Sequence, residues 1–126
     1  RAIGGRAPLH LTSVGKLFLA SDDPSQVRAY VTRTGLSGHT RNSITELGKL
    51  ETELNHVRKV GSARDDEELE IGVSCMAASI LDDAGKLVAG LSLSAPTDRL
   101  QEEWLKALKD TAVQISKSLG YKPTKA

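Results

Sequence analysis

Two serine hydroxyls and one thiol are the side chains of this sequence that best fit the lining of a binding site. Ser92 and Ser94 alternate along one stretch, and Cys75 lies in an earlier stretch of similar character. The residues that share their spacing are small: Ala77, Ser79 and Gly90. Small neighbours leave room above the backbone, and a few polar groups in such a wall suit a small-molecule site. The alternative is a sheet face on which another backbone packs closely.

These side chains lie on a predicted β-hairpin over residues 71–96. The turn cluster at 82–85 contains a glycine that can take the positive φ of a short hairpin loop. A four-residue loop places Cys75 opposite Ser92, and side chains then alternate between two faces. The face opposite the polar one is nearly all apolar and is expected to pack on helices: Ser74, Met76, Ala78, Ile80, Leu87, Ala89, Leu91 and Leu93.

Helices on either side of the hairpin must position it. Apolar spacing and end signals predict helices over residues 13–20, 24–35, 46–60 and 101–119. Ser43 and Glu46 form a possible capping box for the third, and Asp98 with Gln101 a cap pair for the fourth. The buried stripe of the fourth is expected to comprise Trp104, Leu105, Leu108, Ala112, Ile115 and Leu119.

The order of helices, hairpin and helix predicts an α+β fold with an antiparallel sheet. A lone hairpin is marginal in water, so further strands are required. Residues 1–9 and 62–64 are the candidates within the chain, and the acidic run at 65–68 is expected to be a loop. The sheet is expected to extend beyond what this chain supplies.

Composition excludes several classes of function. The chain has 126 residues, which fits one domain, and its net charge is +1 with only 3% aromatic residues. Nucleic-acid binding by this segment is therefore disfavoured, because phosphate and base contacts need clustered cations and aromatic rings. No signal peptide or membrane span is evident, and the single cysteine suits a reducing cytoplasm.

Cys75 also suggests an enzyme, and this alternative stays open. A nucleophilic cysteine needs a base or an electropositive setting, but no motif ties His10, His39 or His56 to Cys75. Asp65, Cys75 and His10 are acceptable metal ligands without a metal-binding spacing. Gly15 and Lys16 lack the spacing of a phosphate loop. No catalytic residue, metal or cofactor is expected.

Several separated motifs together resemble the effector-binding domain of the IclR (isocitrate lyase regulator) family of bacterial transcription regulators. They run in the same order through nearly the whole chain: Pro8-Leu9-His10, Ser13-Val14-Gly15-Lys16, Glu67-Glu68, Gly72, Cys75-Met76-Ala77-Ala78, Leu91 to Pro96 with Arg99, and Ile115 to Tyr121. The resemblance implies a GAF/PAS-like antiparallel sheet flanked by helices. It also implies that residues 1–126 form the later part of that domain, without its first helix and strands and without the winged helix-turn-helix.

The same resemblance implies a function and a site. Such a domain binds a small organic acid, forms a homodimer or tetramer, and acts on operator DNA through the missing segment. Carried over residue by residue, the effector site comprises Ser13, Val14, Asp65, Cys75, Ser92 and Ser94. The backbone N–H groups of Ser13 and Val14 would open a helix and favour an anion. A dimerisation module with a vestigial pocket remains a third interpretation beside the enzyme.

Overall fold

The structure is a computed structural model that describes residues 8–123. Its elements follow in the order η1 (a 3-10 helix, Leu9–Leu11), α1 (Ser13–Ser21), α2 (Pro24–Thr34), α3 (Leu47–Val60), β1 (Ser62–Asp66), β2 (Val73–Leu81), β3 (Leu87–Pro96), η2 (Thr97–Arg99) and α4 (Glu103–Ser118). This order confirms the predicted α+β class.

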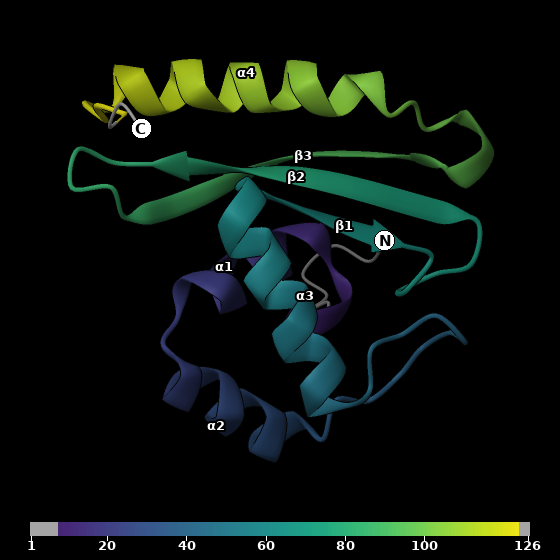
Figure 1. The fold of residues 1–126 in the computed structure, drawn as a ribbon. Helices are drawn as coiled ribbons and strands as arrows, with labels where there is room; N and C mark the ends of the chain where they lie inside the picture. Colours follow the sequence, from purple (N-terminus) through teal and green to yellow (C-terminus); the bar gives the residue numbers. More distant parts are fainter. Residues whose placement is uncertain (1–7, 124–126) are drawn as a thin grey trace, which may run out of the picture.

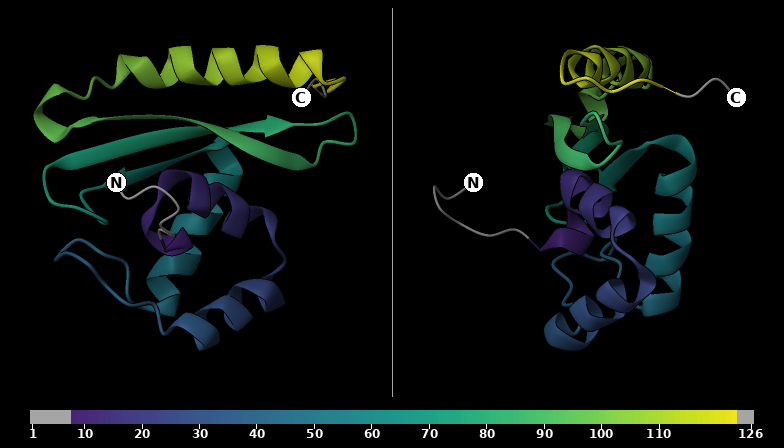
Figure 2. Two further views of the ribbon diagram at one scale, coloured as in Figure 1. Left: turned by 180° about the vertical axis from the view of Figure 1, so that it is seen from behind. Right: turned by 90° about the vertical axis from the view of Figure 1, so that its left-hand side faces the viewer.

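One antiparallel sheet forms the middle layer of the molecule, in the strand order β1-β2-β3 (Figure 1). Helix α4 covers one face, and helices α1 and α3 cover the other, as the two turned views confirm (Figure 2). Helix α2 lies on the far side of α1 and α3, away from the sheet (Figure 1). The third strand expected at residues 62–64 is present and runs on to Asp66. The other candidate strand falls mostly on residues 1–7, outside the described part, and Leu9 belongs to η1.

The predicted register of the hairpin was wrong by two residues. Cys75 pairs with Ser94, and not with Ser92. The loop is wider than the four residues expected, because Leu81 pairs with Leu87 and leaves residues 82–86 between the strands. A bulge between Ile80 and Leu81 shifts the register by one residue more. A shift of two residues keeps each side chain on its face, so the division into two faces survives.

The apolar face packs on α4 as predicted for most of its length. Ala78 and Ile80 form a buried cluster with Ala112, against which Ala89 and Leu91 pack. Leu87 is the exception, since it packs against the cluster on the α1 and α3 side. The bulge explains this difference, because one extra residue reverses the side to which the strand points.

The first two helices follow their sequence signals closely. Thr12 Oγ1 accepts a hydrogen bond from Gly15 N–H at the start of α1, and Asp23 accepts one from Gln26 N–H at the start of α2. Gly35 and Gly61, both with positive φ, end α2 and α3 where expected.

The predicted caps of α3 and α4 are absent. Helix α3 begins at Leu47, and Ser43 Oγ instead accepts hydrogen bonds from the N–H groups of His39 and Thr40. Helix α4 begins at Glu103 without a side-chain cap, since Asp98 already lies in η2. Its stripe is also shorter than predicted, because Trp104 and Leu119 are 37% and 48% exposed.

Candidate functional site

Helix α1 lies across all three strands on the face that carries the predicted polar residues. Its approach is closest at Gly90, where an added Cβ would lie 3.2 Å from both Val14 Cγ atoms and 3.0 Å from Leu17 Cδ1. Here the small residue makes room for a helix and not for a ligand. The close-packing alternative is therefore correct at this end of the face.

A row of polar residues crosses the same face further along the strands. Asp65 on β1 is paired with Cys75 on β2, and Cys75 is paired with Ser94 on β3. Cys75 Sγ lies 3.0 Å from Ser94 Oγ, within hydrogen-bond distance. Ser92 belongs to the neighbouring row, opposite Ala77. Backbone pairing thus brings three of the six predicted site residues into one line, which we call the polar row (Asp65, Cys75 and Ser94).

Burial divides the predicted site residues. Asp65 and Cys75 are buried, and so is Ser13 in the first turn of α1, whereas Val14 is half-buried. Ser92 and Ser94 are exposed on the edge strand β3. Two surface hollows lie elsewhere, one along α3 and one between the hairpin turn and residues 120–122. The open part of the polar face is therefore its β3 side.

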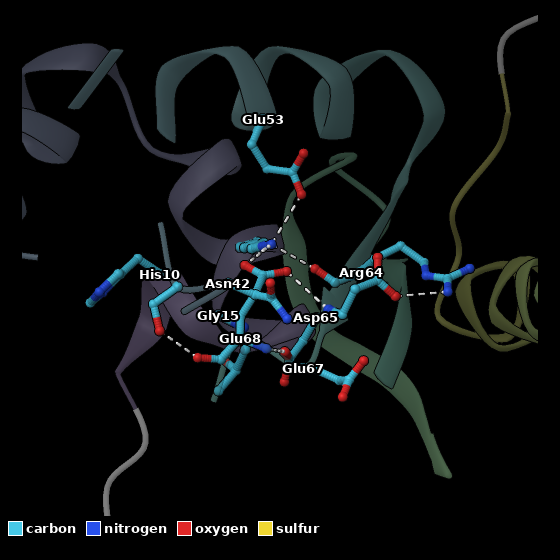
Figure 3. A network of polar contacts seen from close by, with 12 residues as sticks. His10, Gly15, Asn42, Glu53, Arg64, Asp65, Glu67 and Glu68 are labelled. Atoms are coloured by element: carbon cyan, nitrogen blue, oxygen red, sulfur yellow. Dashed lines mark hydrogen bonds and ion pairs between the residues drawn. The ribbon is translucent and has the colours of Figure 1, made fainter. Parts of the chain in front are cut away.

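A buried ion cluster that the sequence interpretation missed lies next to the polar row. Lys16 is fully buried, and its Nζ donates to Glu68 Oε1 at 2.8 Å, to Glu53 Oε2 at 3.0 Å and to the carbonyl of Arg64 at 2.6 Å. In Figure 3 the labelled Glu53 and Glu68 lie on opposite sides of this network. We call Lys16, Glu53 and Glu68 the lysine cluster.

Asp65 joins the lysine cluster to the polar row. Its Oδ1 accepts a hydrogen bond of 2.8 Å from the N–H of Glu68, and this bond holds the turn after β1 (Figure 3). The expectation that the whole run at 65–68 is a loop was wrong, since Asp65 and Asp66 belong to β1. Asp65 and Glu68 are both buried. No local spacing signals this cluster, because Lys16 and Glu68 lie 52 positions apart in the chain.

The two buried carboxyl groups have perturbed acidity. Burial raises the pKa of Asp65, against the opposing effect of backbone hydrogen bonds from Glu68 and Leu69 and of the charge on Lys16. Burial also raises the pKa of Glu68, opposed mainly by Lys16. In both cases desolvation of the charged form outweighs its partners.

A connecting segment closes over the turn that carries Glu68. Thr40 Oγ1 donates to the carbonyl of Glu67 at 2.6 Å, and Ser43 Oγ donates to the carbonyl of Glu68 at 2.6 Å. The connection at 37–46 therefore satisfies backbone carbonyls that would otherwise lack partners.

His10 holds the chain just before α1. Its Nδ1 lies 2.8 Å from Tyr30 Oη and its Nε2 lies 2.9 Å from the carbonyl of Ser37. A carbonyl only accepts, so Nε2 carries the proton and Nδ1 accepts from the Tyr30 hydroxyl. Both nitrogens are thus engaged in structure, which argues against His10 as a base for Cys75.

Two kinds of feature are absent from residues 8–123. No helix there is both long and apolar enough to cross a membrane. No three His, Cys, Asp or Glu side chains there gather in a way that would hold a metal ion.

Comparison with known proteins decides the family. Residues 1–117 match the family described as bacterial transcriptional regulator IclR C-terminal. The chain belongs to the IclR family. The predicted resemblance is thereby confirmed, and it extends over almost the whole sequence.

The curated IclR relatives are repressors. The chain is 38% identical to the DNA-binding transcriptional repressor YiaJ of Escherichia coli K12, over 94% of this chain and 44% of that protein. It is 37% identical to the transcriptional repressor AllR of Salmonella paratyphi A, over 96% of this chain and 46% of that protein. The chain therefore spans less than half the length of these relatives.

Solved IclR-type structures share the fold. The transcriptional regulator YaiJ superposes with a TM-score of 0.88 at 37% identity, over 95% of this chain and 70% of that one. The inducer-binding domain of PobR from Acinetobacter, in complex with 3-hydroxybenzoic acid, gives a TM-score of 0.84 at 29% identity, over 91% and 69%.

Proposed function

We propose that this domain senses a small organic acid for a DNA-binding regulator. The observation that carries the proposal is the polar row on the sheet face that α1 packs against, a face that stays open along β3. Support also comes from PobR, whose domain of the same fold was crystallised with 3-hydroxybenzoic acid. Membership of a family of transcriptional regulators, in which the relative YiaJ is a repressor, supports a sensing role.

In this proposal the effector carboxylate lies at the first turn of α1. Backbone N–H groups of Ser13 and Val14 would meet its charge, aided by the helix dipole. The hydroxyls of Ser92 and Ser94, the thiol of Cys75 and the carboxyl of Asp65 would complete the lining. Part of the domain beyond this chain would cover the exposed serines.

Effector binding would favour one arrangement of the subunits in a homodimer or tetramer. The equilibrium shifts only as far as the effector prefers one state over the other. An attached winged helix-turn-helix would report that shift to operator DNA, in the cytoplasm and without catalysis. The domain itself would need no cofactor.

The test is effector binding by a double variant. Glyoxylate, pyruvate and 3-hydroxybenzoate are titrated into the chain by calorimetry, after a thermal-shift screen in which a ligand of the folded state raises the midpoint. Ser92→Ala with Ser94→Ala should weaken binding at least about tenfold, because each lost hydrogen bond to a charged group is worth about 1.5–3 kcal/mol.

Ser118→Ala is the matched control, because Ser118 is exposed on α4 and its hydroxyl bonds only within the helix. Its affinity should equal that of the unmodified chain. Equal affinity of the double variant would reject the site. A domain that binds no acid yet still assembles would instead support the dimerisation module, and turnover of an acid would support the enzyme.

A further inference from the structure

The acidic side chains around Lys16 outnumber the basic ones. Lys16 is 0% exposed, and the acidic residues Asp65 and Glu68 are 3% and 6% exposed as whole residues. Glu53 adds a third carboxylate at the edge of the lysine cluster. One buried cation therefore faces two buried acids and a partly exposed one.

Lys16 cannot turn to meet an incoming anion. An ammonium group has three N–H donors, and those of Lys16 go to Glu68, Glu53 and the carbonyl of Arg64. An effector carboxylate at the first turn of α1 would thus meet the helix dipole and, across the polar row, the negative charge of Asp65. Two like charges in a partly buried site repel each other strongly.

The charged and titratable side chains near Asp65 come from α1, α3, β1, β2 and the turn after β1. These are Lys16 on α1, Glu53 on α3, Arg64 and Asp66 on β1, Glu68 in the turn and Cys75 on β2. The guanidinium of Arg64 is already held by Glu102 and Asp66, at 2.7 and 2.8 Å. No free cation among these described groups is left to neutralise a second anion.

We propose that the effector anion binds together with one proton, which Asp65 takes up from solvent. This inference rests on the proposed function and adds its regulation by pH. Asp65 is a better acceptor than Glu68, because Glu68 forms a direct ion pair with Lys16 and Asp65 does not. Once protonated, Asp65 changes from a repelling charge into an O–H donor to the effector carboxylate.

The acidity of the free domain agrees with this arrangement. Burial already raises the pKa of Asp65, which is the direction that favours its protonation. An adjacent anion raises that pKa again, and the difference between free and bound states is the linkage.

The experiment counts protons during binding. Glyoxylate, pyruvate and 3-hydroxybenzoate are titrated by calorimetry in two buffers of different ionisation enthalpy, from about pH 5 to about pH 8. We expect uptake of up to about one proton, with affinity rising by at most about tenfold for each pH unit of acidification. The unmodified chain suffices for this result, so it does not depend on the folding of a variant.

The variant Asp65→Asn then tests whether Asp65 is the group that takes up the proton. The amide oxygen can still accept from Glu68 N–H, but the side chain cannot titrate, so proton uptake and the pH dependence of affinity should vanish. Asp98→Asn, an exposed control in η2, should keep both. Binding without proton uptake, or uptake that persists in Asp65→Asn, overturns the inference alone. Absence of binding by all three acids overturns the proposed function, and the inference with it.

Discussion

Lys16 Nζ lies 2.8 Å from Glu68 Oε1, in an ion pair whose side chains are 0% and 9% exposed. The pair joins α1 to the turn after β1, and Glu53 extends it to α3. A buried ion pair of this kind is weak evidence of net stabilisation, yet removing one partner is costly, because it leaves the other charge unpaired away from water.

Lys16→Met should therefore destabilise the fold strongly. The loss leaves Glu68 buried without its cation, and we expect the free energy of unfolding in urea to fall by about 3–5 kcal/mol. Lys106→Met is the control, since Lys106 is exposed and pairs only with Asp110 on the surface of α4. The control should unfold like the unmodified chain. Similar midpoints for the two variants would contradict the structural role of the lysine cluster.

His10 should make stability depend on pH. Burial lowers the pKa of His10 below its ordinary value of 6.5, so the unfolded chain binds a proton more readily than the folded one. Stability from this group is full above about pH 6.5 and is lost as the pH falls from there through the lowered pKa of the folded chain. His10→Gln should remove this part of the slope in urea midpoints measured along the pH range.

His56→Gln is the matched control for that slope, because His56 is exposed on α3. It should retain the pH dependence of the unmodified chain. Asp65 and Glu68, whose pKa values are raised, act in the opposite direction at lower pH, and subtraction of the variant from the unmodified chain isolates His10. Parallel curves for His10→Gln and the unmodified chain would refute the assignment.

Gly90→Ala should destabilise a strand that alanine would ordinarily favour. Its Cβ would press on Val14 and Leu17, and overpacking of this size costs about 1–3 kcal/mol. Gly48→Ala in α3 meets nothing within 4 Å and should instead gain about 0.5–1 kcal/mol. Opposite signs in chemical denaturation are expected, and a stabilised Gly90→Ala would show that α1 is not held at this distance.

Thr12→Ala should cost about 1 kcal/mol of stability, because its Oγ1 accepts from Gly15 N–H at 3.0 Å and caps α1. Thr12→Ser keeps an oxygen in the same place and should retain most of that stability. Denaturation of the three proteins side by side measures the cap. If serine and alanine behave alike, the methyl group matters and the hydrogen bond does not.

Local signals predicted most of the fold. Asp23 and Pro24 define the start of α2, and apolar periodicity defines α3, because these features depend on residues a few positions apart. The hairpin register failed because it depends on the length of the loop and on the bulge at Ile80, which residue types alone do not reveal. The alternation of faces survived because it depends only on strand geometry.

The candidate site was likewise predicted only in part from the sequence. Cys75 and Ser94 share a face by alternation, but their contact at 3.0 Å depends on the register, which places Ser94 and not Ser92 opposite Cys75. The lysine cluster was out of reach, because Lys16 and Glu68 meet only after α1 packs across the sheet. An acidic run in a sequence is usually solvated, and only the packed molecule shows that Glu68 is buried. Asp65 was assigned to the site only through the family resemblance.

Arg64 makes contacts on both faces of the sheet. Its carbonyl oxygen accepts a hydrogen bond from the Lys16 ammonium on the α1 side of the sheet. Its guanidinium donates hydrogen bonds to Glu102, just before α4, on the opposite side. A movement of α1 that displaces Lys16 would therefore act on β1 through the Arg64 carbonyl. The side chain of the same residue contacts Glu102, just before α4. Through this one residue, the helices on the two faces of the sheet are connected.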